Sequence, residues 1–290
     1  MAGERPNRIG QVIGDRFRVD ELIGKGAHAE VFRALDLSTS AYVALKILRH
    51  QHIDDSTTKA RFVREAEVQA RLRHRNIAAL LATGVTEKRE PYLAVELLRG
   101  NTLRGVIKNE GRVSPVRAVS YAWQALAGLS AMHAQGILHR DLKPANIMLE
   151  PSPGPVERVV LIDFGFATFE GSARLTQQGT VVGSLTYMAP ERLLGETVDA
   201  RADVYAIGTI LFELLIGTPP FGAKDDFELI DQQVHEEPPR VRQLDPSLPE
   251  ALDDVLARSL EKHQDDRYES AAAMAADLEQ AARFIAPRSA

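Results

Sequence analysis

The stretch that most constrains this chain is a polar segment near its middle, His139-Arg140-Asp141-Leu142-Lys143-Pro144-Ala145-Asn146. Two further segments follow it in order, Asp163-Phe164-Gly165 and Ala189-Pro190-Glu191. Together they offer a carboxylate that can accept a hydroxyl proton, a lysine beside it, and an amide and a second carboxylate that suit a metal ion. Phosphoryl transfer requires this set of groups. Any one of the short segments could arise by chance, but all of them in this order are hard to explain that way.

These segments resemble the eukaryotic-type Ser/Thr protein kinase family, and within it the bacterial eukaryotic-like (Hanks-type) catalytic domains. The resemblance runs roughly from Phe17 to Phe284. It implies an α+β, bilobal protein-kinase-like fold, with a small antiparallel β N-lobe that carries one regulatory helix and a larger, mainly α-helical C-lobe. We expect an N-terminal extension at 1–16, the N-lobe at 17–98, the C-lobe at 99–284 and a tail at 285–290, which makes one kinase domain at 17–284.

Local patterns predict the same division. Residues 17–48 and 92–98 are rich in β-branched, aromatic and aliphatic residues, which indicates strands. A charged amphipathic helix fits 56–73. Ser114-Pro115 opens a second helix, whose apolar stripe is Val119, Trp123, Leu126 and Leu129 and which ends near Gly136. Further helices are expected at 202–216, 250–261 and 270–284, and the joint between the lobes is expected near 96–100.

Composition excludes several classes of site. The 290 residues include no cysteine, which rules out a disulfide framework, a thiolate zinc site and thiol catalysis. The net charge of −5 gives no reason to expect nucleic acid or an anionic membrane as a partner. The most apolar long segment, 206–217, is far shorter than the roughly 20 residues of a spanning helix. We expect a cytoplasmic protein, or the cytosolic domain of a longer membrane-anchored one, with no membrane contact of its own.

A glycine-containing loop and a lysine-bearing strand indicate the nucleotide site. Gly24 and Gly26 lie between strand signals, and glycines let backbone N–H groups approach phosphate closely. Ala44 and Lys46 are two apart in a strand and share a face. The resemblance implies that ATP is bound by Ile23, Gly24, Gly26, Val31, Ala44, Lys46, Val95, Glu96, Leu98 and Met148, with Val95 as gatekeeper and backbone groups of Glu96 and Leu98 meeting adenine.

Lys46 needs an anionic partner on the helix expected at 56–73. Glu65 shares a face with apolar residues and can point inward, whereas Glu67 shares its face with arginines, so we choose Glu65. One turn later the family usually has an apolar residue, but this chain has Gln69. We expect that glutamine to loosen the helix.

At the catalytic end, the resemblance makes Asp141 the base that receives the substrate hydroxyl proton, and Lys143 the group that neutralises the moving phosphoryl group. Asn146 and Asp163 would hold two Mg²⁺ ions, with Mn²⁺ as an alternative. Lys143 also marks kinases that act on serine and threonine of protein substrates. Further residues are assigned by resemblance as a substrate platform and as structural support: Ser184, Asp203, Glu191 and Arg267. The histidines His133, His28 and His235 show no partner spacing and are expected to be incidental.

Arg140 suggests that phosphorylation regulates activity, because a cation beside Asp141 can bind a phosphorylated segment through charge-assisted hydrogen bonds. Thr176 and Thr180 are the expected autophosphorylation sites, modified within a transient homodimer. The alternatives are a pseudokinase scaffold and a small-molecule phosphotransferase. The presence of Lys46, Asp141 and Asp163 argues against the first, and the segment from 183 to 191, which resembles a platform for a protein substrate, argues against the second.

Overall fold

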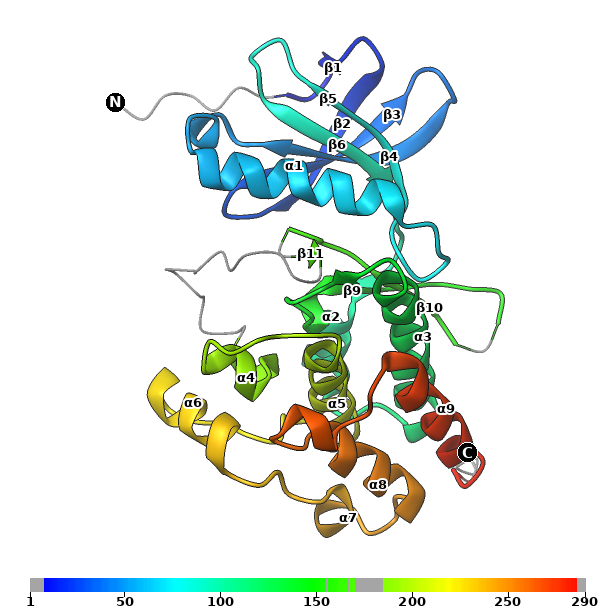
Figure 1. Ribbon diagram of the computed structural model, residues 1–290. Coiled ribbons are helices and arrows are strands. Elements are labelled where there is room, and N and C mark those ends of the chain that lie inside the picture. The colour runs from blue at the N-terminus through cyan, green and yellow to red at the C-terminus, as the bar shows by residue number, and fades with distance from the viewer. Residues whose placement is uncertain (1–7, 155, 166, 170–184, 286–290) are drawn as a thin grey trace. The chain divides into compact units, whose positions relative to one another are not determined.

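The computed structural model describes residues 8–154, 156–165, 167–169 and 185–285. The chain divides into two compact units. Unit 1 comprises Met1–Arg73 and Ala78–Leu98, and unit 2 comprises His74–Ile77 and Arg99–Ala290. Unit 1 is a curled antiparallel sheet with a helix, and unit 2 is mainly helical, which confirms the expected fold class (Figure 1).

In the described part of unit 1, six strands form a sheet in the order β1-β2-β3-β4-β6-β5, and every neighbouring pair is antiparallel. Hairpin connections explain most of this order, because antiparallel neighbours need only short turns. The strands are β1 (Val12–Ile13), β2 (Phe17–Lys25), β3 (Ala29–Asp36), β4 (Ala41–Leu48), β5 (Leu80–Val85) and β6 (Pro91–Glu96).

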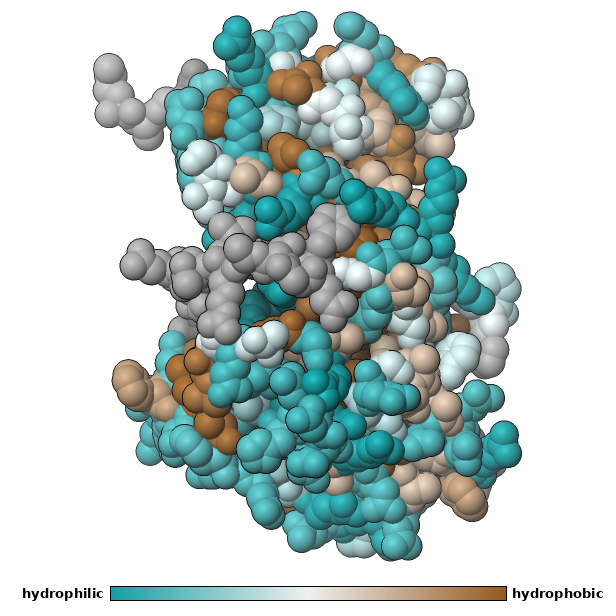
Figure 2. Space-filling model, in the orientation of Figure 1, coloured by the Kyte–Doolittle hydropathy of each residue, from teal (hydrophilic) through white to brown (hydrophobic). Residues whose placement is uncertain are grey.

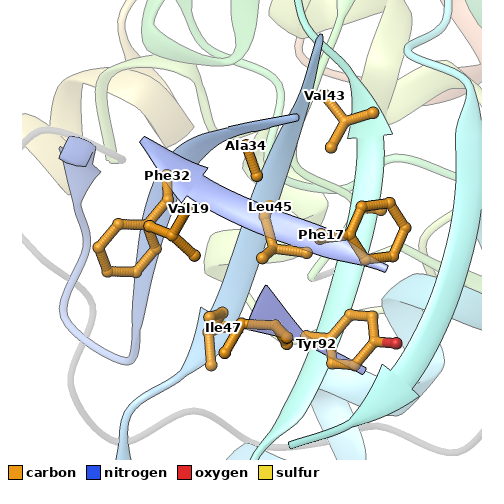
Figure 3. Packing of buried hydrophobic residues seen from close by; sticks show 10 residues of the cluster. Phe17, Val19, Phe32, Ala34, Val43, Leu45, Ile47 and Tyr92 are labelled. Carbon is orange, nitrogen blue, oxygen red and sulfur yellow. The ribbon is translucent and has the colours of Figure 1, made fainter. Parts of the chain in front are cut away.

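One face of this sheet carries the apolar core of unit 1. Figure 3 shows side chains from β2, β3, β4 and β6 pointing toward one another, among them Phe17, Phe32, Leu45 and Tyr92. Leu45 and Phe17 are completely buried. Because side chains alternate along a strand, the residues between these core residues lie on the opposite face. The core therefore occupies one face and leaves the other for α1 and for the predicted nucleotide contacts.

Helix α1 (Ser56–Arg71) packs on that second face. Its N-cap, Asp55, accepts hydrogen bonds from the backbone N–H groups of Thr57 and Thr58. The buried side of α1 includes Phe62, which packs with Ala29, Leu48 and Leu93. The same side carries two buried polar residues, Glu65 and Gln69.

Unit 2 is built around α5 (Arg201–Ile216), whose residues from Ala202 to Leu215 are all buried. An apolar helix of this kind lies in the centre of a domain. The other helices are α2 (Leu103–Glu110), α3 (Pro115–His133), α4 (Pro190–Leu193), α6 (Asp226–His235), α7 (Val241–Leu244), α8 (Glu250–Ser259) and α9 (Ala271–Ala282). The short strands are β7 (Asn101–Thr102), β8 (Ile137–Leu138), β9 (Ile147–Glu150), β10 (Arg158–Leu161) and β11 (Thr168–Phe169).

The expected helices are present. Four of them are shorter than expected and α5 begins one residue earlier, at Arg201, but one side-chain prediction was wrong. Trp123 was expected in the buried stripe of α3, and it is 43% exposed. The other three residues of the predicted stripe, Val119, Leu126 and Leu129, are buried, together with small residues such as Ala122 and Ala125. No described helix is long and apolar enough to cross a membrane.

The surface of unit 2 carries an exposed apolar patch in the view of Figure 2. A brown patch appears there where Figure 1 places α4 and α6. Exposed apolar residues of these elements are Leu194, which follows α4, and Phe227, which is 88% exposed.

Candidate active site

The loop between β8 and β9 brings three of the predicted catalytic residues together in unit 2. Lys143 Nζ lies 2.7 Å from Asp141 Oδ2. Asn146 Nδ2 donates to the Asp141 backbone oxygen at 2.8 Å and to Asp141 Oδ2 at 3.2 Å. Asp141 is buried, and both of its described side-chain partners contact the same carboxylate oxygen. The arrangement fixes the direction of the Asp141 carboxylate.

The β9–β10 hairpin brings Asn146 and Asp163 to one end. Ile147, the first residue of β9, pairs with Leu161, the last residue of β10. Asn146 precedes that pair and Asp163 follows it, and the Ile162 N–H donates to the Asn146 carbonyl at 2.9 Å. Because the amide nitrogen of Asn146 is directed at Asp141, its Oδ1 is the atom suited to a cation. An amide oxygen and a carboxylate are oxygen donors of the kind that Mg²⁺ prefers.

Buried Asp203 on α5 supports the catalytic loop from within. It accepts hydrogen bonds from the His139 N–H at 2.9 Å and from the Arg140 N–H at 3.0 Å. Arg140 has a φ of +63°, a conformation that costs free energy for a non-glycine residue. The two hydrogen bonds compensate for that cost by holding the turn.

His133 is also a partner of Asp203, with Nε2 at 2.9 Å from Oδ2, so the expectation that it is incidental was wrong. Burial favours the neutral form of Asp203, but the hydrogen bonds from His133 and His139 favour the carboxylate and hold its pKa below the ordinary value. No local pattern indicated this pair, because its members are 70 positions apart. His28 lies with its ring centroid 4.8 Å from that of His52, and His235 pairs with Asp231 on α6.

His139 and Phe164 connect the two motifs by ring contact. Their ring centroids are 5.6 Å apart, and both residues are completely buried. Neither ring nitrogen of His139 has a hydrogen-bond partner among the described residues. Burial accordingly lowers the pKa of His139 and keeps the ring neutral. The residue acts as an apolar packing group next to Asp163, whose φ is +63°.

In unit 1, Lys46 forms an ion pair with Glu65. Lys46 Nζ lies 2.6 Å from Oε1 and 2.8 Å from Oε2 of Glu65. Glu65 is buried, whereas Glu67 is exposed. The structure therefore places at Lys46 the acid that the sequence favoured.

The remaining predicted nucleotide contacts of unit 1 follow from strand register. Val31 lies opposite Lys46, and Ala44 lies opposite Val95. Opposite residues of antiparallel strands share a face, and so do residues two apart in one strand, so all of these lie on the face that α1 covers in part. The other predicted contacts are Ile23 and Gly24 in β2, Gly26 in the turn after it, Glu96 at the end of β6, Leu98 at the end of unit 1, and Met148 in β9 of unit 2.

A buried ion pair lies in unit 2 between Glu191 on α4 and Arg267. The guanidinium binds the carboxylate with both terminal nitrogens, at 2.9 and 2.8 Å. It also donates to the backbone oxygens of Glu261 and Lys262. Thr176, Thr180 and Ser184 lie outside the described residues.

Sequence reasoning missed a buried carboxylate near the predicted substrate platform. Glu213 accepts a 2.6 Å hydrogen bond from the Tyr187 hydroxyl and lies 3.3 Å from Arg104 Nη1. Burial raises the pKa of Glu213, and that of Tyr187 as well. A glutamate inside an apolar helix pattern was the available signal, because a buried acid requires partners.

Comparison with known proteins decides the family. A family model, the protein kinase domain, matches residues 17–278. The chain belongs to the protein kinase family. Members of this family use ATP as the phosphoryl donor and a divalent metal ion, and the family assignment agrees with the resemblance that the motifs carry.

Three relatives show where within the family the chain falls. It is 38% identical over 288 residues to a probable serine/threonine-protein kinase, CE0033, of Corynebacterium efficiens, a match that covers 96% of this chain and 43% of the relative. It is 38% identical to the probable serine/threonine-protein kinase PknB of Corynebacterium glutamicum, over 92% of this chain and 42% of the relative. It is also 38% identical to the serine/threonine-protein kinase pkn3 of Myxococcus xanthus, over 93% and 51%. The chain thus spans about half of the length of these relatives, or less.

Proposed function

We propose that this chain transfers the γ-phosphoryl group of ATP to serine or threonine hydroxyls of proteins. The observation that carries the proposal is the grouping of Asp141, Lys143 and Asn146 on one loop. In this reaction Asp141 accepts the hydroxyl proton while the substrate oxygen bonds to the γ-phosphorus and the bond from that phosphorus to the ADP oxygen breaks, so that ADP leaves. Lys143 offsets the charge of the moving phosphoryl group, and its ammonium already lies beside Asp141.

Asn146 and Asp163 would hold magnesium, with manganese as an alternative. The bound metal would neutralise charge on the phosphate oxygens. Lys46 orients the phosphates, and Glu65 holds the lysine in place. Ile23, Val31, Ala44 and Met148 would enclose the adenine ring, and the backbone of Glu96 and Leu98 would bind its edge.

The proposed activity is tested by transfer of labelled phosphate from ATP to the protein itself and to a generic basic protein. Asp141→Asn removes the proton acceptor while keeping the side-chain shape, and we expect it to lower the rate by at least about 100-fold. Lys46→Met should also abolish transfer. Equal transfer by wild type and Asp141→Asn would exclude the proposed chemistry, and no transfer by wild type would favour a pseudokinase. Intact-mass measurement after incubation with ATP alone separates a protein kinase from a small-molecule phosphotransferase, because only the former should gain phosphate.

Regulation by the chain's own phosphorylation is part of the proposal. Thr176 and Thr180 are the proposed sites, Arg140 is the proposed phosphate-binding cation, and Ser184 is proposed to form part of the platform for the protein substrate. Phosphopeptide mapping of active protein should find Thr176 or Thr180 modified. If a transient homodimer carries out the reaction, the initial rate per molecule should rise with protein concentration, whereas a constant rate would indicate reaction within one molecule.

The proposed location is the cytoplasm, either as a free protein or as the cytosolic part of a membrane-anchored one. Fractionation of cells that express the native protein would distinguish these two cases.

A further inference from the structure

Gln69 is a polar residue on the buried side of α1, where an apolar residue would pack without a hydrogen-bonding requirement. Only 3% of its surface is exposed, and Val68 beside it is completely buried. It stands four residues after Glu65, so both side chains lie on the same side of the helix. Burying an amide costs free energy unless its groups are paired. The presence of a buried amide at this position is therefore not explained by packing alone.

The nitrogen of the Gln69 amide makes a hydrogen bond that an apolar side chain cannot make. Nε2 donates to the backbone oxygen of Ala78 at 2.9 Å, and Ala78 is itself buried. The other half of the amide, Oε1, is buried without a hydrogen-bond partner among the described residues. An unpaired buried acceptor is unfavourable, and leucine or methionine would avoid it. What these residues cannot supply is the donor for Ala78, so the function of Gln69 lies in this hydrogen bond.

Ala78 lies two residues before β5, which begins at Leu80 and pairs with β6 in the sheet of unit 1. The residue between them, Ala79, is bonded to the end of β6, because its carbonyl accepts from the Glu96 N–H at 2.9 Å. The backbone next to Ala78 is therefore held by the sheet. Gln69 consequently ties the last turn of α1 to the sheet that also carries Lys46, in β4.

The same helix carries Glu65, whose ion pair with Lys46 depends on short distances, 2.6 and 2.8 Å. A slide or rotation of α1 by a fraction of a turn would separate these groups. We propose that Gln69 is a positioning residue for phosphoryl transfer: its hydrogen bond to Ala78 fixes α1 so that Glu65 holds Lys46. This inference rests on the proposed function. It reverses the expectation that Gln69 loosens the helix, because the amide adds a tie that an apolar side chain lacks.

The test replaces Gln69 by leucine, which keeps the size and removes both the donor and the unpaired acceptor. The control is Glu67→Leu, the same new side chain on the exposed side of the same helix. We expect Gln69→Leu to lower kcat at saturating Mg-ATP by about threefold to tenfold, the effect of one lost hydrogen bond. The KM for ATP should change less than kcat, because a misplaced Lys46 affects the transition state most. The melting temperature should stay close to that of wild type, because losing one bond is offset by losing the unpaired oxygen.

Hydrogen exchange provides a readout that does not depend on activity. Amides of α1 should exchange faster in Gln69→Leu than in wild type and in Glu67→Leu. Should the leucine variant fail to fold, Gln69→Met carries the same test with a more flexible side chain. An unchanged or increased kcat in the folded variant, or a loss of activity that only follows the folded fraction, overturns the inference. If the wild type itself transfers no phosphate, the proposed function is wrong. Unchanged hydrogen exchange in α1 of Gln69→Leu would then show that the hydrogen bond from Gln69 to Ala78 does not fix the helix either.

Discussion

The buried pair of Arg267 and Glu191 allows a stability prediction with a defined magnitude. The Arg267 side chain is completely buried and that of Glu191 is 4% exposed. All donors of the guanidinium are used, on the two carboxylate oxygens and on backbone oxygens of Arg201, Glu261 and Lys262. Glu191→Gln keeps the shape but leaves the cation without its counter-charge. Removing one partner of such a pair costs about 3–5 kcal/mol of unfolding free energy.

The assay is urea denaturation, supported by thermal melting. A cost of about 3 kcal/mol corresponds to a drop in melting temperature of roughly 6–12 °C for a protein of this size. Arg267→Met should be at least as damaging, because it leaves a buried carboxylate and several unpaired carbonyls. The double variant Glu191→Gln/Arg267→Met should be more stable than the sum of the single changes predicts, since it removes both charges together.

A matched control uses an exposed partner of the same region. Asp265 contacts Arg201 at 2.6 Å, but its side chain is 86% exposed, so Asp265→Asn should change the unfolding free energy by less than about 1 kcal/mol. The reasoning is refuted if Glu191→Gln costs no more than this control, or if the double variant loses the full sum of the two single costs.

Three further predictions address backbone geometry, pH and the support of the catalytic loop. Gly100→Ala should lower the unfolding free energy by about 1–3 kcal/mol, measured by denaturation, because φ is +117° and the new Cβ would overlap the Leu149 carbonyl oxygen. Burial and a nearby guanidinium lower the pKa of Lys262 from 10.5 to about 8. The unfolded chain therefore binds more protons across that window, and the unfolding free energy of wild type relative to Lys262→Met should rise as the pH increases from 8 toward 10.5; a flat difference would contradict this. His133→Leu should cost about 1–3 kcal/mol in the same assay, because buried Asp203 loses a hydrogen-bond donor, and an unchanged midpoint would show that the pair contributes nothing.

How far the sequence predicted the fold depended on the strength of local patterns. The helix at 56–73 and the one opened by Ser114-Pro115 were recognisable from cap residues and apolar spacing, and both are present. Helix α6 was not, because only Leu229 and Gln233 of its residues are buried and its other side chains are mainly charged or polar. A helix with so little buried apolar surface leaves a weak periodic signal.

In the candidate site, contacts within one motif could be predicted from the sequence, whereas contacts between distant segments could not. Asp141, Lys143 and Asn146 lie within six positions, so their grouping could be inferred from the motif itself. The bond from Gln69 to Ala78 and the contact of His133 with Asp203 depend on how distant segments pack, and periodicity carries no information about such pairs. For the same reason the sequence indicated that Gln69 departs from the usual pattern but not that its amide donates to the Ala78 carbonyl.

In the catalytic loop, the residue that holds the backbone in place differs from the residue that accepts the proton. A substitution at one of them therefore tests folding, and a substitution at the other tests the reaction. Asp203 holds the His139 and Arg140 peptides of a turn with positive φ, so changing it would relax the loop and disturb folding together with any activity. Asp141 receives its described side-chain contacts from Lys143 and Asn146 on its own loop, and the loop is fixed independently through Asp203. Asparagine at position 141 can therefore keep the loop in place while removing the proton acceptor. A loss of activity in Asp141→Asn with unchanged stability reports on the chemistry, whereas the same loss in Asp203→Asn would not.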